Sequence, residues 1–171
     1  MTTFTPHKAM RKKRILLVDD EKSLTRLVKL SLENNGPYEV KVENQGARAV
    51  KIARNFRPDL VLLDVCLVDT DGGQVAREIL SDMELKHTPI IFMTALVSRE
   101  DIWEKPVLTG GIPVLGKPFD AAKLIACIER RLADPSAGAT SGKGTSDTRL
   151  IRKNLLEGKF AFRPMASPSE N

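Results

Sequence analysis

Short apolar runs alternate along the chain with longer segments in which apolar residues recur at helical spacing. The runs are rich in Val, Ile and Leu, which favours buried strands; they cover residues 14–18, 38–42, 59–63, 89–93 and 112–115. Between them, apolar residues recur every three or four positions, as on one face of a helix; these segments cover residues 22–34, 46–56, 72–84 and 120–132. The pattern predicts five strands connected by amphipathic helices.

The apolar face of each predicted helix contains the residues expected in the core. They are Leu24, Leu27, Val28 and Leu32; Ala49, Val50, Ala53 and Phe56; Val75, Ala76, Ile79, Leu80 and Met83; and Leu124, Ile125, Ile128 and Leu132. Nearly all-apolar strands that alternate with helices are typical of a parallel sheet covered on both faces, with right-handed connections. We therefore expect a doubly wound α/β domain.

A further helix is expected over residues 97–108, between the fourth and fifth strands. Pro106 falls in what would be its last turn, and Gly110 and Gly111 follow. Proline lacks the backbone donor that a helix interior needs. We expect this helix to be short or irregular.

The composition changes after the predicted domain, which we place at residues 14–134. Residues 135–147 are small, polar and glycine-rich, as in a flexible linker. The tail, residues 148–171, has one apolar helical face formed by Leu150, Ile151 and Leu155. A helix this short is marginal in isolation. The tail is thus either disordered or a peptide that packs on the domain or docks to a partner.

The net charge of +5 lies at the two ends of the chain. Residues 1–14 carry five basic and no acidic side chains, and residues 135–171 carry six basic and three acidic ones, whereas residues 15–134 carry sixteen basic and nineteen acidic ones. We interpret residues 1–13 as a solvated basic arm. A DNA-binding domain usually carries its positive charge on the folded body, and no helix-turn-helix domain fits in residues 135–171, so this distribution argues against DNA binding.

Two further features concern the compartment. No apolar run approaches the roughly 18–20 residues of a membrane span, and the first residues lack the apolar segment of a signal peptide. Cys66 and Cys127 lie in apolar segments without Cys-x-x-Cys spacing, which favours buried thiols over disulfides or a zinc site. We expect a cytoplasmic protein with no membrane span.

Polar residues follow four of the five predicted strands. Asp19 and Asp20 follow the first strand, Asp64 the third, Thr94 the fourth and Lys117 the fifth. The functional crevice of a doubly wound sheet lies beyond the carboxyl ends of its strands. Each residue alone has an ordinary explanation as a helix cap or turn residue. Carboxylates that converge in an apolar scaffold nevertheless repel one another unless a cation is present.

Residues 14–134 resemble the receiver domain of two-component response regulators, and especially the stand-alone regulators of chemotaxis. The resemblance is carried by Asp19-Asp20, Asp64, Thr94, Lys117-Pro118-Phe119, Asp71-Gly72 and Gly46. It implies a flavodoxin-like sheet with the strand order 2-1-3-4-5. It also implies a phosphoprotein of a two-component system or phosphorelay that accepts a phosphoryl group from a histidine kinase or phosphotransfer protein and signals to another protein. Beyond phosphorylation and dephosphorylation of its own aspartate, it would not be an enzyme.

The resemblance implies a metal-assisted nucleophile at the sheet edge that carries Asp19, Asp20 and Asp64, called the acidic edge below. Asp64 would be the phosphoacceptor, a carboxylate that forms a mixed anhydride with phosphate. Asp20, Asp64 and the backbone carbonyl of Cys66 would bind Mg²⁺ directly, while Asp19 would reach it through water. A hard cation with oxygen ligands and several retained waters suits such a set.

The remaining two site residues would act on the phosphoryl oxygens. Lys117 would supply a positive charge, and the Thr94 hydroxyl would move to donate a hydrogen bond, which makes Thr94 part of the switch. The Lys117–Pro118 bond is usually cis in this family, and we expect the same here.

Three residues depart from or vary the family pattern. Val114 occupies the second switch position, where receivers usually carry a Tyr or Phe ring that turns inward; a β-branched side chain has little freedom to do so. Val68 occupies a position where proline is usual. Cys66, two residues after Asp64, either tunes hydrolysis of the phosphoryl group or is only a small loop residue. These departures bear on how, or whether, phosphorylation is transmitted to a partner and not on the phosphorylation chemistry itself.

Two other function classes compete with the receiver. The sequence Asp69-x-Asp71-Gly72 is similar to the nucleophile motif of haloacid-dehalogenase-type phosphatases. In that family, however, the motif directly ends the first strand, whereas here the apolar strand ends at Asp64. The second alternative is a pseudo-receiver, a binding module that keeps the fold without being phosphorylated; the altered switch favours it and the full set of charged residues argues against it.

Overall fold

The computed structural model describes residues 11–95 and 112–133. The helix expected over residues 97–108, including Pro106, lies outside these residues, as do the linker at 135–147 and the tail at 148–171. Among the helices of the described residues, none is long and apolar enough to cross a membrane.

The described residues form a five-stranded sheet in which all neighbouring strands are parallel. The strands are β1 (Lys13–Val18), β2 (Tyr38–Glu43), β3 (Leu60–Asp64), β4 (Ile90–Thr94) and β5 (Val114–Gly116). Their order is β2-β1-β3-β4-β5, which confirms the strand order implied by the resemblance. Both the doubly wound topology and the five predicted strands are confirmed.

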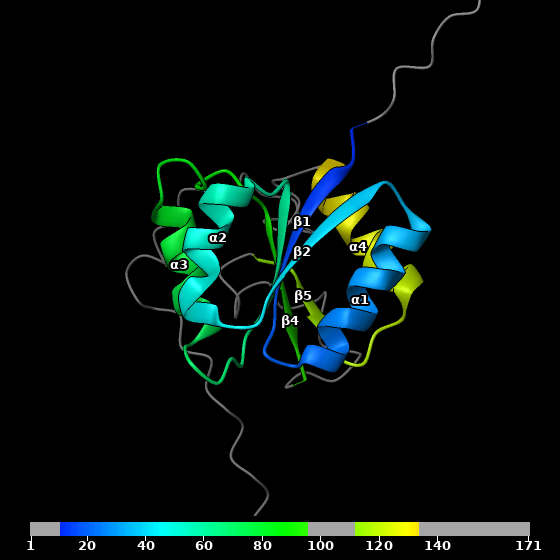
Figure 1. The fold of residues 1–171 in the computed structure, drawn as a ribbon, viewed down its shortest axis with the longest axis horizontal. Coiled ribbons are helices and arrows are strands. Elements are labelled where there is room, and N and C mark those ends of the chain that lie inside the picture. The colour runs from blue at the N-terminus through cyan, green and yellow to red at the C-terminus, as the bar shows by residue number, and fades with distance from the viewer. Residues whose placement is uncertain (1–10, 96–111, 134–171) are drawn as a thin grey trace, which may run out of the picture.

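Helices cover both faces of this sheet. They are α1 (Lys22–Asn35), α2 (Ala49–Phe56), α3 (Gly72–Ser81) and α4 (Ala121–Ala133), with a 3₁₀ turn, η1 (Gly46–Arg48), directly before α2. Figure 1 shows α2 and α3 on one face and α1 and α4 on the other. Successive strand residues point to opposite faces, so Leu16, Leu63 and Phe92 pack in one core and Ile15, Leu62 and Met93 in the other.

The corner between α1, β2 and α4 contains a buried tyrosine. Tyr38, at the start of β2, is 1% exposed, and its hydroxyl donates a hydrogen bond to the Glu129 carboxylate on α4. A Cβ at Gly36 would lie 2.3 Å from the Tyr38 ring, so the chain needs glycine where α1 turns into β2. Helix α4 is thereby connected to the edge strand β2.

Two residues expected in the core are on the surface instead. Leu27 on α1 is 66% exposed, and Met83 is 80% exposed. Met83 is exposed because α3 ends at Ser81 rather than at residue 84. The Asp82 carboxylate accepts hydrogen bonds from the amides of Glu84 and Leu85, a local turn that replaces the next helical turn.

Candidate functional site

The sheet register places the predicted site residues at one edge. Val18 and Leu63 are Cα partners on β1 and β3, so Asp19 and Asp64, the next residue of each chain segment, lie side by side. Thr94 ends β4 opposite Gly116 of β5, and the Lys117 amide donates to the Thr94 carbonyl at 2.7 Å. The parallel strands thus bring together residues that are far apart in the sequence.

Three carboxylates form the centre of this edge. One oxygen from each of Asp19, Asp20 and Asp64 lies within 4.8 Å of the other two. Asp19 is fully buried and Asp64 is 5% exposed. Two unit charges at this separation repel by about 3 kcal/mol at an effective dielectric constant near 20. Oxygen atoms in this arrangement are the ligand set that a hard divalent cation prefers.

Lys117 is the cation that faces these carboxylates. Its Nζ lies 2.6 Å from Asp19 Oδ2 and 3.2 Å from Asp64 Oδ2, and its side chain is 14% exposed. Burial opposes its charge, but the hydrogen bond to Asp19 and the charge of Asp64 raise the pKa of Lys117 above its usual value. The Lys117–Pro118 peptide bond is cis, as expected from the resemblance.

The Asp64 carboxyl has an unfavourable environment for its charge. Burial raises the pKa of Asp64, the charge of Lys117 lowers it, and the neighbouring Asp19 raises it again, with a net upward shift. Burial is thus the largest cause of the shift, and the charge of Lys117 does not fully offset it. A further cation at this edge would favour the ionised, nucleophilic form of Asp64.

Backbone amides hold the other two carboxylates. Asp19 Oδ1 accepts from the Glu21 amide at 2.9 Å, so both oxygens of Asp19 have protein donors. Asp20 Oδ2 accepts from the Val68 amide at 2.8 Å. A proline at position 68 could not donate this hydrogen bond because it has no N–H. Val68 as a whole residue is 92% exposed.

Asn44 also belongs to this edge, although the sequence analysis did not include it. Its side-chain amide donates to the Asp19 carbonyl at 2.6 Å and to Thr25 Oγ1 at 3.2 Å. Asn44 comes directly after β2. It is thus a polar residue that follows a strand, and this position in the sequence could have identified it as a residue of this edge.

The two aspartates of the phosphatase-like motif have structural partners. Asp69 accepts from the amides of Gly46 and Ala47, at 3.0 and 2.9 Å. Asp71 is the N-cap of α3 and accepts from the Gln74 amide at 3.0 Å. Neither residue ends a strand, so the geometry gives no support to a phosphatase nucleophile there.

Two further predicted residues, Cys66 and Val114, differ in their surroundings. Cys66 is exposed, which corrects the expectation of a buried thiol, and the pKa of its thiol is raised by partial burial and by the charge of Asp64. Cys127 is buried as expected. Val114 opens β5 opposite Phe92 and is 6% exposed, so it is a core residue in this structure.

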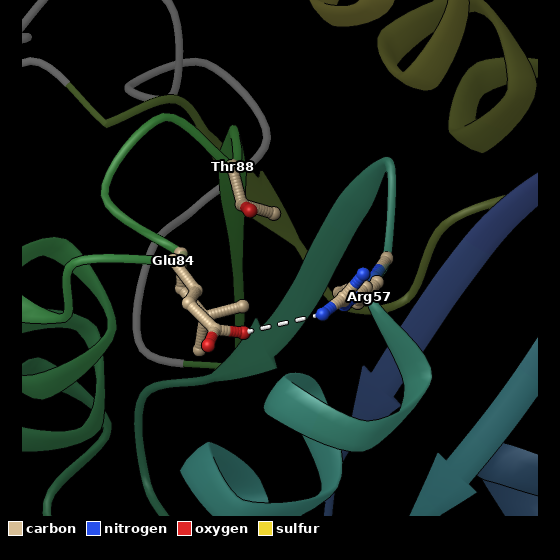
Figure 2. A pocket seen from close by; sticks show the side chains of 5 residues that line it. Arg57, Glu84 and Thr88 are labelled. Carbon is tan, nitrogen blue, oxygen red and sulfur yellow. Dashed lines mark ion pairs between the residues drawn. The ribbon is translucent and has the colours of Figure 1, made fainter.

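A hollow of about 350 Å³ lies at the opposite edge of the sheet. It is lined by Arg57, Pro58, Glu84, Leu85 and Thr88, which precede β3 and β4 or belong to the turn after α3. Figure 2 shows the 3.8 Å ion pair between Arg57 and Glu84 at this hollow. It contains none of the predicted site residues and is separate from the acidic edge.

Comparison with known proteins agrees with this geometry. The family model of the response regulator receiver domain matches residues 15–129. The polar-differentiation response regulator DivK of Brucella anthropi is 31% identical over 123 residues, which are 71% of this chain and 98% of that protein. The transcriptional regulatory protein TrcR of Mycobacterium tuberculosis is 35% identical over 116 residues, but the chain spans only 42% of its length.

Solved structures give the same result. The chemotaxis protein CheY4 of Vibrio cholerae superposes with a TM-score of 0.61 and 28% identity, over 70% of this chain and 98% of that one. The BeF₃-activated receiver domain of RstA from Klebsiella pneumoniae has a TM-score of 0.60 and 28% identity, over the same shares of the two chains. With its sheet order, its acidic edge and the family match over residues 15–129, the chain belongs to the response regulator receiver domains.

Proposed function

We propose that Asp64 accepts a phosphoryl group, with Mg²⁺ at the acidic edge, from a phosphohistidine of a histidine kinase or phosphotransfer protein. The observation that supports this most directly is the convergence of Asp19, Asp20 and Asp64 within 4.8 Å, with Lys117 only partly compensating their charge. The proposal includes a cytoplasmic location and signalling by protein contact.

In the proposed reaction, an Asp64 carboxylate oxygen attacks the phosphorus atom. An O–P bond forms, the N–P bond of the phosphohistidine breaks, and its electron pair returns to the imidazole nitrogen. Water later attacks the phosphorus, which releases inorganic phosphate and restores the Asp64 carboxylate. Mg²⁺ would supply positive charge to the phosphoryl oxygens and reduce their repulsion from the carboxylates.

Asp20, Asp64 and the Cys66 carbonyl would hold this ion. The donor set fits, because three carboxylates supply the oxygen ligands that Mg²⁺ prefers. Asp19 would act through water, in agreement with the two protein donors that already bind its oxygens. The fit of carboxylate chemistry to a hard cation supports the proposal.

Lys117 and Thr94 would stabilise the phosphorylated state. Lys117 already contacts Asp64 at 3.2 Å, so its ammonium would neutralise a phosphoryl oxygen on that residue. Thr94 is fully buried at the end of β4, and its hydroxyl would donate a hydrogen bond to the phosphate. Val114, packed in the core opposite Phe92, would limit the movement at the second switch position.

Intact-mass measurement after incubation with acetyl phosphate and Mg²⁺ tests the proposal. We expect one added phosphate on the parent chain, none on Asp64→Asn, and none when EDTA removes the metal. Asp82→Asn is the matched control, because Asp82 is an aspartate that binds two backbone amides far from the acidic edge; it should label like the parent. Equal labelling of Asp64→Asn and the parent would refute Asp64 as the phosphoacceptor.

The same samples separate the competing function classes. A pseudo-receiver would remain unlabelled in every condition, and a phosphatase would turn over p-nitrophenyl phosphate in a manner that depends on Asp69. We expect turnover at background level, because Asp69 binds the amides of Gly46 and Ala47. Tight duplex binding that persists at physiological salt would favour DNA as the partner instead of a protein.

A further inference from the structure

The β3–α3 loop, residues 65–71, is attached to the rest of the domain on two sides. On one side, the Val68 amide donates to Asp20 Oδ2 at 2.8 Å. On the other side, the Asp69 carboxylate accepts from the amides of Gly46 and Ala47 at the start of η1. Val68 and Asp69 are consecutive residues, so only the Val68 Cα and one peptide unit lie between the Val68 N–H and the Cα that carries the Asp69 side chain.

The packing around Gly46 keeps the loop close to η1. A Cβ at Gly46 would lie 2.4 Å from Thr70 Cγ2 and 2.6 Å from Leu67 Cδ1. Leu67 is largely buried, and it lies in the same core as the α2 residues Ala49 and Ala53. The loop therefore contacts η1 through side chains on both sides of Asp69 and is held there by its carboxylate.

Through this arrangement, a residue outside the acidic edge can control a carboxylate within it. Fixing Asp69 against η1 restricts the position of the Val68 amide, because peptide units are planar and only the φ and ψ dihedrals of Val68 separate its N–H from the Asp69 Cα. That amide holds one oxygen of Asp20, and the second oxygen of the carboxylate then has a defined direction. Partners that hydrogen-bond to a metal-binding carboxylate set its orientation and so its affinity for the metal.

We propose that Asp69 is a positioning residue that acts through the Val68 amide to orient Asp20 for the cation at the acidic edge. The inference rests on the proposed function for the identity of that cation as Mg²⁺. Asp69 touches neither the cation nor the phosphoryl group. The hydrogen bonds from Ala47 and Gly46 also lower the pKa of Asp69, so its carboxylate is ionised when it accepts them.

Two measurements on the full chain test this assignment: the Mg²⁺ dissociation constant by calorimetry, and hydrogen exchange of the Val68 amide by NMR without metal. For Asp69→Ala we expect Mg²⁺ binding about three to ten times weaker, less than the roughly 10–100-fold typical of direct partners of metal ligands. The Val68 amide should exchange faster. Asp69→Asn keeps one acceptor oxygen and should lie between the parent and Asp69→Ala in both measurements.

Two further variants separate positioning from general stability. Asp82→Ala also removes a carboxylate that binds two backbone amides, but after α3, so it should leave Mg²⁺ binding and Val68 exchange unchanged. Val68→Pro removes the donor to Asp20 and leaves the Asp69 carboxylate in place. It should weaken Mg²⁺ binding while the amides of Gly46 and Ala47 stay protected.

The possible outcomes distinguish this inference from the proposed function. Parent values of Mg²⁺ affinity and Val68 exchange in Asp69→Ala would overturn the positioning role, and so would tighter or equal Mg²⁺ binding by Val68→Pro. If Asp69→Ala does not fold, Asp69→Asn decides by the same criteria. A parent chain that binds no Mg²⁺ would refute the proposed function, and Val68 exchange would still show whether Asp69 positions the loop.

Discussion

Gly72, the first residue of α3, lies against the backbone of the strand that ends in Asp64. A Cβ at this position would lie 2.1 Å from the Asp64 carbonyl oxygen and 2.9 Å from Val65 Cα. Ordinary contact begins at 3.4 Å, so in Gly72→Ala the two backbones must separate by more than 1 Å. Neither contact is with a flexible side chain that could turn away.

The expected loss of stability follows from three terms. Overpacking of this kind costs about 1–3 kcal/mol, and separation weakens the 3.0 Å hydrogen bond from the Gly72 amide to the Val65 carbonyl, which contributes about 0.5–1.5 kcal/mol. Alanine restricts the unfolded chain and returns about 0.4–1 kcal/mol. Together these terms lower the free energy of unfolding of Gly72→Ala by about 0.5–4 kcal/mol.

Urea unfolding measures this difference, because the midpoint shifts at constant slope when only stability changes. We also expect labelling of Asp64 by acetyl phosphate to slow by roughly tenfold to a hundredfold, since a displacement near 1 Å can have this effect on a reacting group. Gln74→Ala, on the exposed side of the same helical turn, is the control and should change stability by less than about 0.5 kcal/mol. Parent-like stability and labelling of Gly72→Ala would refute the close contact.

Three further predictions concern Asp64, Tyr38 and Asp71. The pKa of Asp64 is raised by burial and by Asp19, so its ionisation destabilises the fold as pH rises from the ordinary carboxyl range through the raised value. Without metal, Asp64→Asn should therefore be more stable than the parent at pH 7, and the difference should shrink on acidification. A variant that is less stable than the parent in urea unfolding would contradict this. Burial and the hydrogen bond to Glu129 raise the pKa of Tyr38, which is the only tyrosine in the sequence. Absorbance of the folded protein should therefore show no phenolate until the pH is well above the usual pKa of tyrosine. Titration near pH 10 would be inconsistent with a buried ring. Asp71→Ala removes the N-cap of α3 and should lower the free energy of unfolding, measured in urea, by about 0.5–2 kcal/mol. Asp71→Ser should restore most of this stability, because serine is also a good N-cap residue. An equal loss of stability in both variants would indicate that the cap is not responsible.

Strands β3 and β4 were predictable because their burial is nearly complete. Residues 60–63 and 90–93 are at most 1% exposed, which leaves a continuous apolar run in the sequence rather than an alternation. The strand order came from the resemblance. Short, buried parallel strands pair in many orders without changing their apolar pattern, so the composition of β3 alone does not indicate that it lies between β1 and β4.

The helix details that differed depend on contacts between distant residues. The segment 46–56 begins as the 3₁₀ turn η1, where Asp69, more than twenty residues later, binds the first two amides. Leu27 follows the apolar spacing of α1, yet it is exposed while its neighbour Val28 is buried. The spacing of one helix face does not show how far that face extends around the helix.

The grouping of the predicted site residues at one edge was predictable because each ends or follows a strand, and the parallel sheet brings such positions together. Asn44 follows β2 in the same way, but its contribution is a hydrogen bond to the Asp19 carbonyl, and many polar loop residues have no such role. The Val68 amide was not recognisable at all. A backbone donor has no side-chain signature, and only its 2.8 Å contact with Asp20 identifies it.

Under the proposed function, the charge balance of the acidic edge would make phosphorylation a switch. Asp64 and Asp19 share the single ammonium of Lys117, and Asp20 adds a third negative charge. A phosphoryl group on Asp64 would replace the single negative charge of the carboxylate with a group of up to about two negative charges, so Lys117 would have to divide its interactions among more acceptors. The 2.6 Å contact with Asp19 would then compete with contacts to phosphate, and its loss would leave a fully buried carboxylate without that partner. Under the proposed function, the energy that changes the conformation would come from this redistribution of Lys117, with the cation at Asp20 and Asp64 making the added charge tolerable.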